Sequence, residues 1–60
     1  MNYWIGVDTG GTFTDCVIMD GKGTLSSSKA PSTPKDLSVG VLNSIEATAD
    51  SMGIRLEDIL

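Results

Sequence analysis

The first half of the chain alternates between apolar runs and glycine-containing breaks, a pattern typical of short β-strands joined by turns. Two runs, at residues 3–8 and 13–20, place apolar side chains on both faces of the pleat. Strands of that kind usually lie inside a sheet that is covered on both sides. A third run, at residues 24–30, is mostly Ser and Thr, which suits an exposed edge strand. The pattern therefore predicts three strands, with the first in the interior of a sheet.

The breaks between these runs are short, which favours antiparallel hairpins. The first break contains Gly10-Gly11. The second contains Asp20-Gly21, a pair that supplies the positive φ required by tight hairpins. We therefore expect an antiparallel meander.

A helix is predicted at residues 34–52. Thr33 is suited to the N-cap, Pro34 to the first helical position, and Asp36 to the third. Gly53 stands where a glycine commonly ends a helix. Apolar residues recur at helical spacing and form one face, with one neighbour that widens it: Leu37, Val41, Ile45, Ala49, Met52 and Leu42.

The predicted order of strand, strand, strand and helix indicates an α/β fold. The first strand has only one partner in this order, and the helix has more apolar surface than a small sheet needs. The 60 residues contain a single cysteine and no histidine, so neither a disulfide within the chain nor a histidine-based metal site can stabilise so small a domain. We therefore expect a further strand, parallel to the first, beyond residue 60, and interpret the chain as the beginning of a larger domain.

Composition and charge narrow the functional classes. The net charge is −4, and the four basic residues are scattered, which argues against nucleic-acid binding. The apolar run near the N-terminus is too short for a signal peptide or a membrane span. A lone cysteine without an export signal favours a cytoplasmic location. Cys16 itself is expected in the core, because no histidine is present to activate it as a nucleophile.

The candidate chemistry lies in the first turn. Gly10 and Gly11 lack side chains, so successive backbone N–H groups can converge on phosphate oxygens there. Thr9 and Thr12 can add hydroxyl donors, and Asp8 at the strand end can hold Mg²⁺ through water. The same spacing also fits an ordinary hairpin, and spacing alone slightly favours that plainer interpretation.

The octapeptide DTGGTFTD, at residues 8–15, resembles the N-terminal signature of the hydantoinase/oxoprolinase family. That family includes N-methylhydantoinase A, 5-oxoprolinase and the acetone and acetophenone carboxylase subunits. The resemblance implies the first β-β-β-α segment of an actin-like ATPase (ribonuclease H-like) domain, with ATP and Mg²⁺ as cofactors. It places the metal, through water, at Asp8, and the phosphates at Thr9, Gly10, Gly11 and Thr12. It assigns no catalytic residue, and it gives no role to Thr14 or Asp15.

The function implied by the resemblance is ATP-dependent opening of a cyclic amide such as a hydantoin or 5-oxoproline, through phosphorylation of the amide. A subunit of an ATP-dependent ketone carboxylase is an alternative from the same family. A sugar kinase shares the first part of the motif, but the Phe13-Thr14-Asp15 ending argues against it. A small non-enzymatic module is the remaining alternative. The implied partners are the cyclic amide, the rest of the parent chain and a second subunit, without nucleic acid or membrane.

Overall fold

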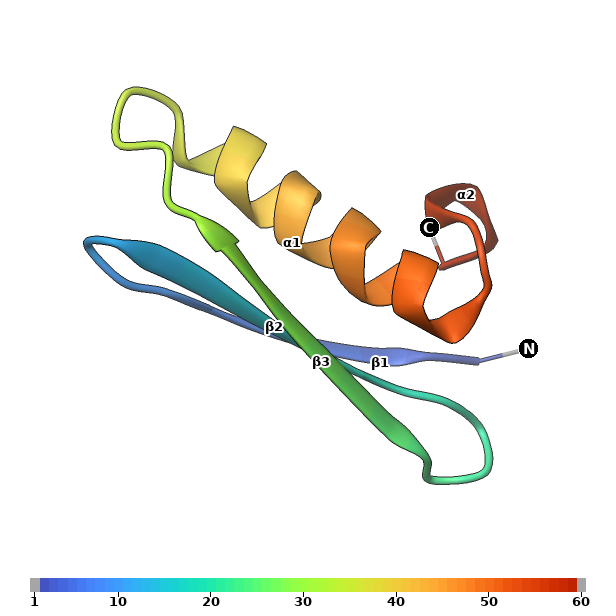
Figure 1. Cartoon of the computed structure of the whole chain (residues 1–60). Coiled ribbons are helices and arrows are strands. Elements are labelled where there is room, and N and C mark those ends of the chain that lie inside the picture. Colours follow the sequence, from blue (N-terminus) through green and yellow to red (C-terminus); the bar gives the residue numbers. More distant parts are fainter. Residues whose placement is uncertain (1, 60) are drawn as a thin grey trace.

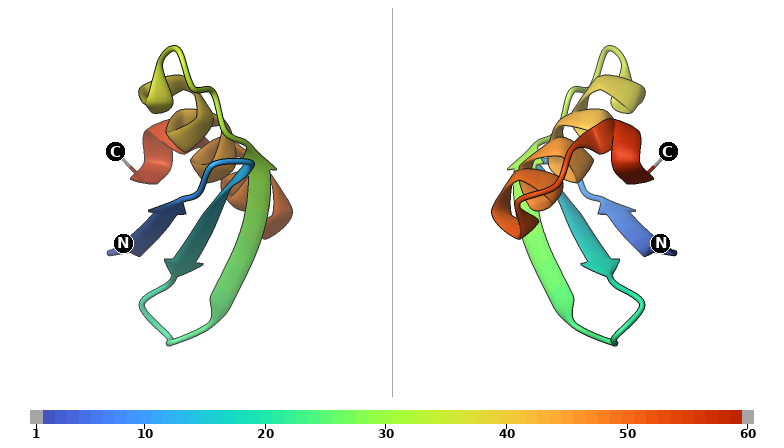
Figure 2. Two further views of the ribbon diagram at one scale, coloured as in Figure 1. Left: turned by 90° about the vertical axis from the view of Figure 1, so that its left-hand side faces the viewer. Right: turned by 90° about the vertical axis from the view of Figure 1, so that its right-hand side faces the viewer.

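The computed structural model describes residues 2–59. Three strands, β1 (Trp4–Thr9), β2 (Phe13–Met19) and β3 (Leu25–Pro31), are followed by a long helix α1 (Leu37–Met52) and a short helix α2 (Leu56–Ile59). The strands form one antiparallel sheet in the order β1-β2-β3. Helix α1 lies across one face of this sheet and leaves the opposite face open (Figures 1 and 2). The predicted α/β arrangement of three antiparallel strands and a helix is confirmed.

Strand β2 divides its side chains between the two faces of the sheet. Thr14, Cys16 and Ile18 alternate along the strand and are fully buried. Successive side chains of a strand point to opposite faces, so these three define the face covered by α1. We call the other face, which carries Asp15 and Val17 of this strand, the open face. The expected place of Cys16 in the core is confirmed.

Strand β1 is not buried, contrary to the expectation from its apolar pattern. All six of its residues are exposed, including Trp4 at 55%. Within the described residues β1 is an edge strand, paired only with β2. The apolar pattern on both of its faces therefore has no cover within residues 2–59. Strand β3 forms the other edge, as its polar composition predicts.

The face of α1 against the sheet combines small residues with part of the predicted apolar stripe. Gly40, Ser44 and Thr48 are spaced four apart and are buried. The hydroxyl of Ser44 donates to the Val41 carbonyl (2.7 Å), and that of Thr48 donates to the Ser44 carbonyl (2.8 Å), so neither burial leaves a polar group unpaired. The predicted apolar stripe is confirmed in part. Ile45 and Ala49 are buried and Val41 and Met52 pack at the edge of the core, but Leu37 and Leu42 are about half exposed.

Helix α1 begins three residues later than predicted. Asp36, not Thr33, is the N-cap, and its carboxylate accepts from the Ser38 N–H (3.1 Å). Thr33 still satisfies an amide of the first turn, since its hydroxyl accepts from the Gly40 N–H at 2.7 Å. Pro34 lies in the turn before the helix. At the other end Gly53 has φ 75° and ends the helix as predicted.

The second turn also differs in detail from the prediction. The positive φ falls on Gly23 (85°), not on Gly21. Asp20 organises the loop, because its carboxylate accepts from the N–H groups of Lys22 (2.8 Å) and Thr24 (3.0 Å). No helix among residues 2–59 has the length and apolar content that crossing a membrane requires.

Candidate functional site

The first turn connects β1 and β2 with Gly11 and Thr12 at its tip. The Gly10 N–H donates to the Phe13 carbonyl at 2.9 Å and closes the hairpin. Neither glycine has a positive φ, so backbone conformation alone does not explain the pair. A Cβ on Gly10 would lie 3.1 Å from the Phe13 carbonyl oxygen, whereas a Cβ on Gly11 would meet no atom within 4 Å. Gly10 is thus explained by crowding within the hairpin, and Gly11 is not.

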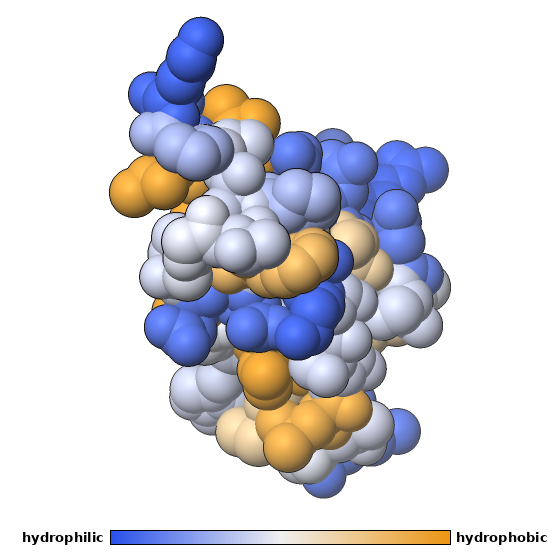
Figure 3. Space-filling view, turned by 60° about the vertical axis from the view of Figure 1, so that its left-hand side comes forward, coloured by the Kyte–Doolittle hydropathy of each residue, from blue (hydrophilic) through white to orange (hydrophobic). Residues whose placement is uncertain are grey.

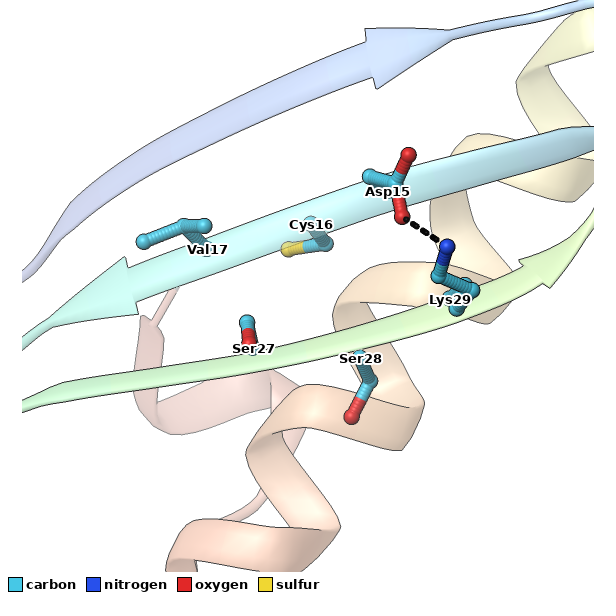
Figure 4. Close-up of a pocket in the computed structure, with 6 residues that line it drawn as sticks. All are labelled: Asp15, Cys16, Val17, Ser27, Ser28 and Lys29. Carbon is cyan, nitrogen blue, oxygen red and sulfur yellow. Dashed lines mark ion pairs between the residues drawn. The ribbon is translucent and has the colours of Figure 1, made fainter.

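Asp8 and Asp15 lie next to each other on the open face. The register pairs Asp8 with Asp15, and Asp15 in turn with Lys29. Residues directly opposite in adjacent strands share a face, so a row of two acids and a lysine crosses the sheet just below the turn. The Lys29 ammonium lies 3.4 Å from the Asp15 carboxylate (Figure 4). It offsets the repulsion between two neighbouring carboxylates, and its contact with Asp15 is on the side away from β1.

The threonines of the predicted site are not on the same face as Asp8. Thr9 is paired with the buried Thr14, which places it on the α1 side of the sheet. Thr12 is exposed at the tip of the turn. The structure therefore brings the Asp8 carboxylate together with Asp15 on the open face. Thr9 lies on the opposite face of the sheet, which α1 covers.

Ser32, just after β3, is bonded to both ends of the turn. Its N–H donates to the Thr12 carbonyl (2.9 Å), and its hydroxyl donates to the Gly10 carbonyl (2.7 Å). The same hydroxyl lies 3.0 Å from the hydroxyl of Thr14. The β1–β2 turn, the end of β3 and the start of α1 meet at one end of the molecule (Figure 1). The sequence pattern did not indicate Ser32, because its contact with Gly10 spans 22 residues.

The described residues do not form a metal site from protein ligands alone. Among residues 2–59, no group of three or more His, Cys, Asp or Glu side chains is placed to hold a metal ion. Mg²⁺ needs six oxygen ligands but keeps several waters, so one or two carboxylates together with substrate phosphates are enough. Asp8 and Asp15 fit that limited role. The exposed tip at Gly11 fits a close approach of phosphate to backbone.

The hollow between β2 and β3 is a separate feature. It is lined by residues from both strands, Asp15, Cys16, Val17, Ser27, Ser28 and Lys29 (Figure 4). It shares Asp15 and Lys29 with the row of charges that begins at Asp8. No residue of the β1–β2 turn lines it, so it adds no group to the turn.

A three-stranded antiparallel sheet followed by a covering helix, with a glycine turn and a strand-end carboxylate, is consistent with the N-terminal segment of an actin-like fold. The sequence profile of the hydantoinase/oxoprolinase N-terminal region matches residues 4–60. The chain belongs to the hydantoinase/oxoprolinase family.

Two characterised relatives are similar along most of the chain. The acetophenone carboxylase gamma subunit of Aromatoleum aromaticum is 47% identical over 57 residues, which cover 93% of this chain and 8% of the relative. The caprolactamase subunit alpha of Pseudomonas jessenii is 43% identical over 51 residues, which cover 85% of this chain and 7% of the relative. The chain thus spans less than a tenth of the length of either relative.

Proposed function

We propose that the chain is the phosphate-binding N-terminal segment of an ATP-dependent enzyme that opens a cyclic amide. The observation that carries the proposal is the turn itself. A family-specific motif presents an exposed backbone at Gly11, with space for a ligand, beside the carboxylate of Asp8 on the open face. Family membership supports the same assignment.

In this proposal the backbone of residues 9–12 holds the phosphates of ATP. Asp8 would hold Mg²⁺ through water, and the bound ion would neutralise charge on the phosphates. The backbone N–H groups of the turn would stabilise the negative charge that develops during phosphoryl transfer, so positioning and electrostatics would provide the catalysis.

The proposed reaction begins with attack of the amide oxygen on the γ-phosphorus of ATP. The bond from that phosphorus to the β–γ bridging oxygen breaks, and ADP leaves with the electron pair. Water then adds to the activated carbonyl carbon, and the ring C–N bond breaks as the nitrogen takes a proton. A second water releases phosphate and leaves the ring-opened amino acid. The residues that bind the amide lie outside this chain in the proposal.

A ketone carboxylase subunit is the second candidate, favoured by the similarity to the acetophenone carboxylase gamma subunit. A ketone and a cyclic amide both offer a carbonyl oxygen to the γ-phosphate, so the same turn suits both reactions. Both relatives are named as subunits, which supports a partner subunit for the parent of this chain. A cytoplasmic location stays a prediction from the lone cysteine.

Asp8→Asn in the full-length protein tests the proposed role of Asp8. We expect the rate of ATP turnover with a lactam, a hydantoin or 5-oxoproline to fall about a hundredfold, the usual cost of removing one preorganised charge-stabilising group. Asp50→Asn, a change at an exposed acid on α1, is the matched control and should leave the rate unchanged. Product analysis separates the candidates: a ring-opened amino acid indicates the hydrolase, a carboxylated ketone the carboxylase, and a phosphorylated sugar a kinase. If Asp8→Asn kept the full rate of ATP turnover, the role proposed for Asp8 would be wrong.

A further inference from the structure

We infer that Thr14 and Ser32 form a hydrogen-bond relay that orients the backbone of the phosphate-binding turn. The inference rests on the proposed function, and it assigns to both residues a positioning role. It starts from the direction of one proton. The hydroxyl of Ser32 has a single hydrogen, which it donates to the Gly10 carbonyl at 2.7 Å. In the 3.0 Å contact between the two hydroxyls, Thr14 is therefore the donor and Ser32 the acceptor.

Thr14, the end of the relay away from Gly10, is held in place by burial. Thr14 is fully buried between the sheet and α1, so its hydroxyl has no access to water and needs a partner within the protein. Ser32 is that partner. Two hydrogen bonds in series polarise each other, which strengthens the hold on the Gly10 carbonyl. Burial of Thr14 thus determines the direction of a carbonyl in an exposed turn.

The direction of the Gly10 carbonyl determines the direction of the next amide. No peptide bond in the described residues is cis. In a planar trans peptide the carbonyl and the following N–H point in opposite directions. Because the Gly10 carbonyl points toward the hydroxyls on the α1 side, the Gly11 N–H points away from them, toward the open face. Asp8 and Asp15 lie on that face. The relay therefore aims the Gly11 N–H toward the side of the sheet on which the proposed Mg²⁺–phosphate group is held.

Ser32 also holds the other side of the turn. Its N–H donates to the Thr12 carbonyl at 2.9 Å, a bond that any residue other than proline can make. Substitution of the side chain therefore removes the relay and keeps this second attachment. Thr33, the next residue, is bonded through its hydroxyl to the Gly40 N–H, so α1 supports the same loop.

The relay is tested with Ser32→Ala and Thr14→Val in the full-length protein. Loss of one hydrogen bond should weaken ATP binding about threefold to tenfold. Ser32→Thr and Thr14→Ser keep the hydroxyls and should restore the affinity. Ser27→Ala, at an exposed serine of β3, is the matched control. The double variant should bind ATP no more weakly than Ser32→Ala alone, because both changes break the same relay. Unchanged affinity in Ser32→Ala, or losses that add independently, would overturn the inference.

A second measurement needs no nucleotide. With ¹⁵N-labelled glycine, the backbone order parameter of Gly11 in Ser32→Ala should fall below about 0.6, while Ser27→Ala keeps it near the rigid value of about 0.85. An unchanged order parameter in Ser32→Ala would contradict the relay even if ATP binds. If the unsubstituted protein binds no ATP, the proposed function fails, and the relay is then decided by this order parameter alone.

Discussion

At the scale of single residues, the two glycines of the turn have different physical reasons to be glycine. A Cβ added to Gly10 would lie 3.1 Å from the Phe13 carbonyl oxygen, which is a crowded contact. A Cβ added to Gly11 would meet no atom within 4 Å. The DTGGTFTD motif therefore combines a residue required by the hairpin with a residue that the isolated hairpin does not require. The second kind is the one expected at a ligand site.

Substitution of each glycine by alanine should separate these two reasons. Gly11→Ala should leave the melting temperature nearly unchanged, because an exposed change without a clash costs within about 0.5 kcal/mol. It should weaken ATP binding by about tenfold, the value of one charge-assisted hydrogen bond, because a methyl group then stands at the tip of the turn. Gly10→Ala should instead lower the melting temperature. Calorimetry and equilibrium ATP binding on both variants of the full-length protein make the comparison, and full affinity in Gly11→Ala would exclude phosphate from the tip.

How far the sequence predicted the site can be judged from four residues. Asp8 and Gly11 were predicted as site residues because the motif is local and continuous, and that role stays a prediction. The direction of Asp15 could not be predicted, since it depends on which face of β2 is covered by α1. Ser32 could not be predicted at all, because its bond to Gly10 exists only after β3 has returned along β2. The sequence shows a local motif directly, but it does not show contacts between strands.

At the scale of elements, α1 is anchored to the turn region by a close contact at Gly40. A Cβ there would lie 3.0 Å from the Thr33 hydroxyl and 3.2 Å from both the Pro31 carbonyl and the Thr33 nitrogen. Two of these three atoms belong to the backbone, so the loop before the helix has little freedom to move aside. Because Gly40 contributes no side chain, the backbone of the helix approaches the loop that carries Ser32 closely.

Gly40→Ala should destabilise the protein although alanine favours helices. The gain in helix propensity is about 1 kcal/mol, and overpacking costs about 1–3 kcal/mol, so the net effect should be a loss. Asn43→Ala, at an exposed position of the same helix, should be neutral or slightly stabilising. Thermal unfolding of both variants measures the difference. If Gly40→Ala raised the melting temperature as much as Asn43→Ala, the close contact would not limit packing.

The start of α1 shows why a correct signal can predict the wrong boundary. Thr33, Pro34 and Asp36 all favour a helix start, and each suits a different register. The structure selects Asp36 as N-cap, because Thr33 is then free to accept from Gly40 and to donate to the Asp36 carbonyl at 2.6 Å. The contact of Gly40 with the Pro31 carbonyl and with Thr33 then fixes the helix against the end of β3. The helix itself was predictable from local pattern, but its first residue was determined by packing.

At the scale of the whole molecule, the described residues leave much apolar surface in solvent. Among residues 2–59, the buried apolar core consists of five residues, Cys16, Ile18, Ala30, Ile45 and Ala49. Nine larger apolar side chains of the same range are exposed: Trp4, Ile5, Val7, Phe13, Val17, Leu25, Leu37, Val39 and Leu42. Figure 3 shows such apolar surface, in orange, between polar regions of one face. So small a core contributes little to stability, and a sheet edge with exposed apolar residues favours pairing with another chain.

The 60-residue chain on its own should therefore associate or melt without a cooperative transition. Strand β1 is the edge expected to pair, because the β3 edge is polar and carries Lys29. Trp4 and Leu25 lie in the same row of the open face, on opposite edges of the sheet, since both pair with Met19. Trp4→Lys should reduce association in sedimentation measurements over a range of concentrations, whereas Leu25→Lys should change it little. Equal effects of the two lysines would show that general hydrophobicity, not the β1 edge, drives association. A monomeric chain with a single sharp melting transition would show that the small core suffices.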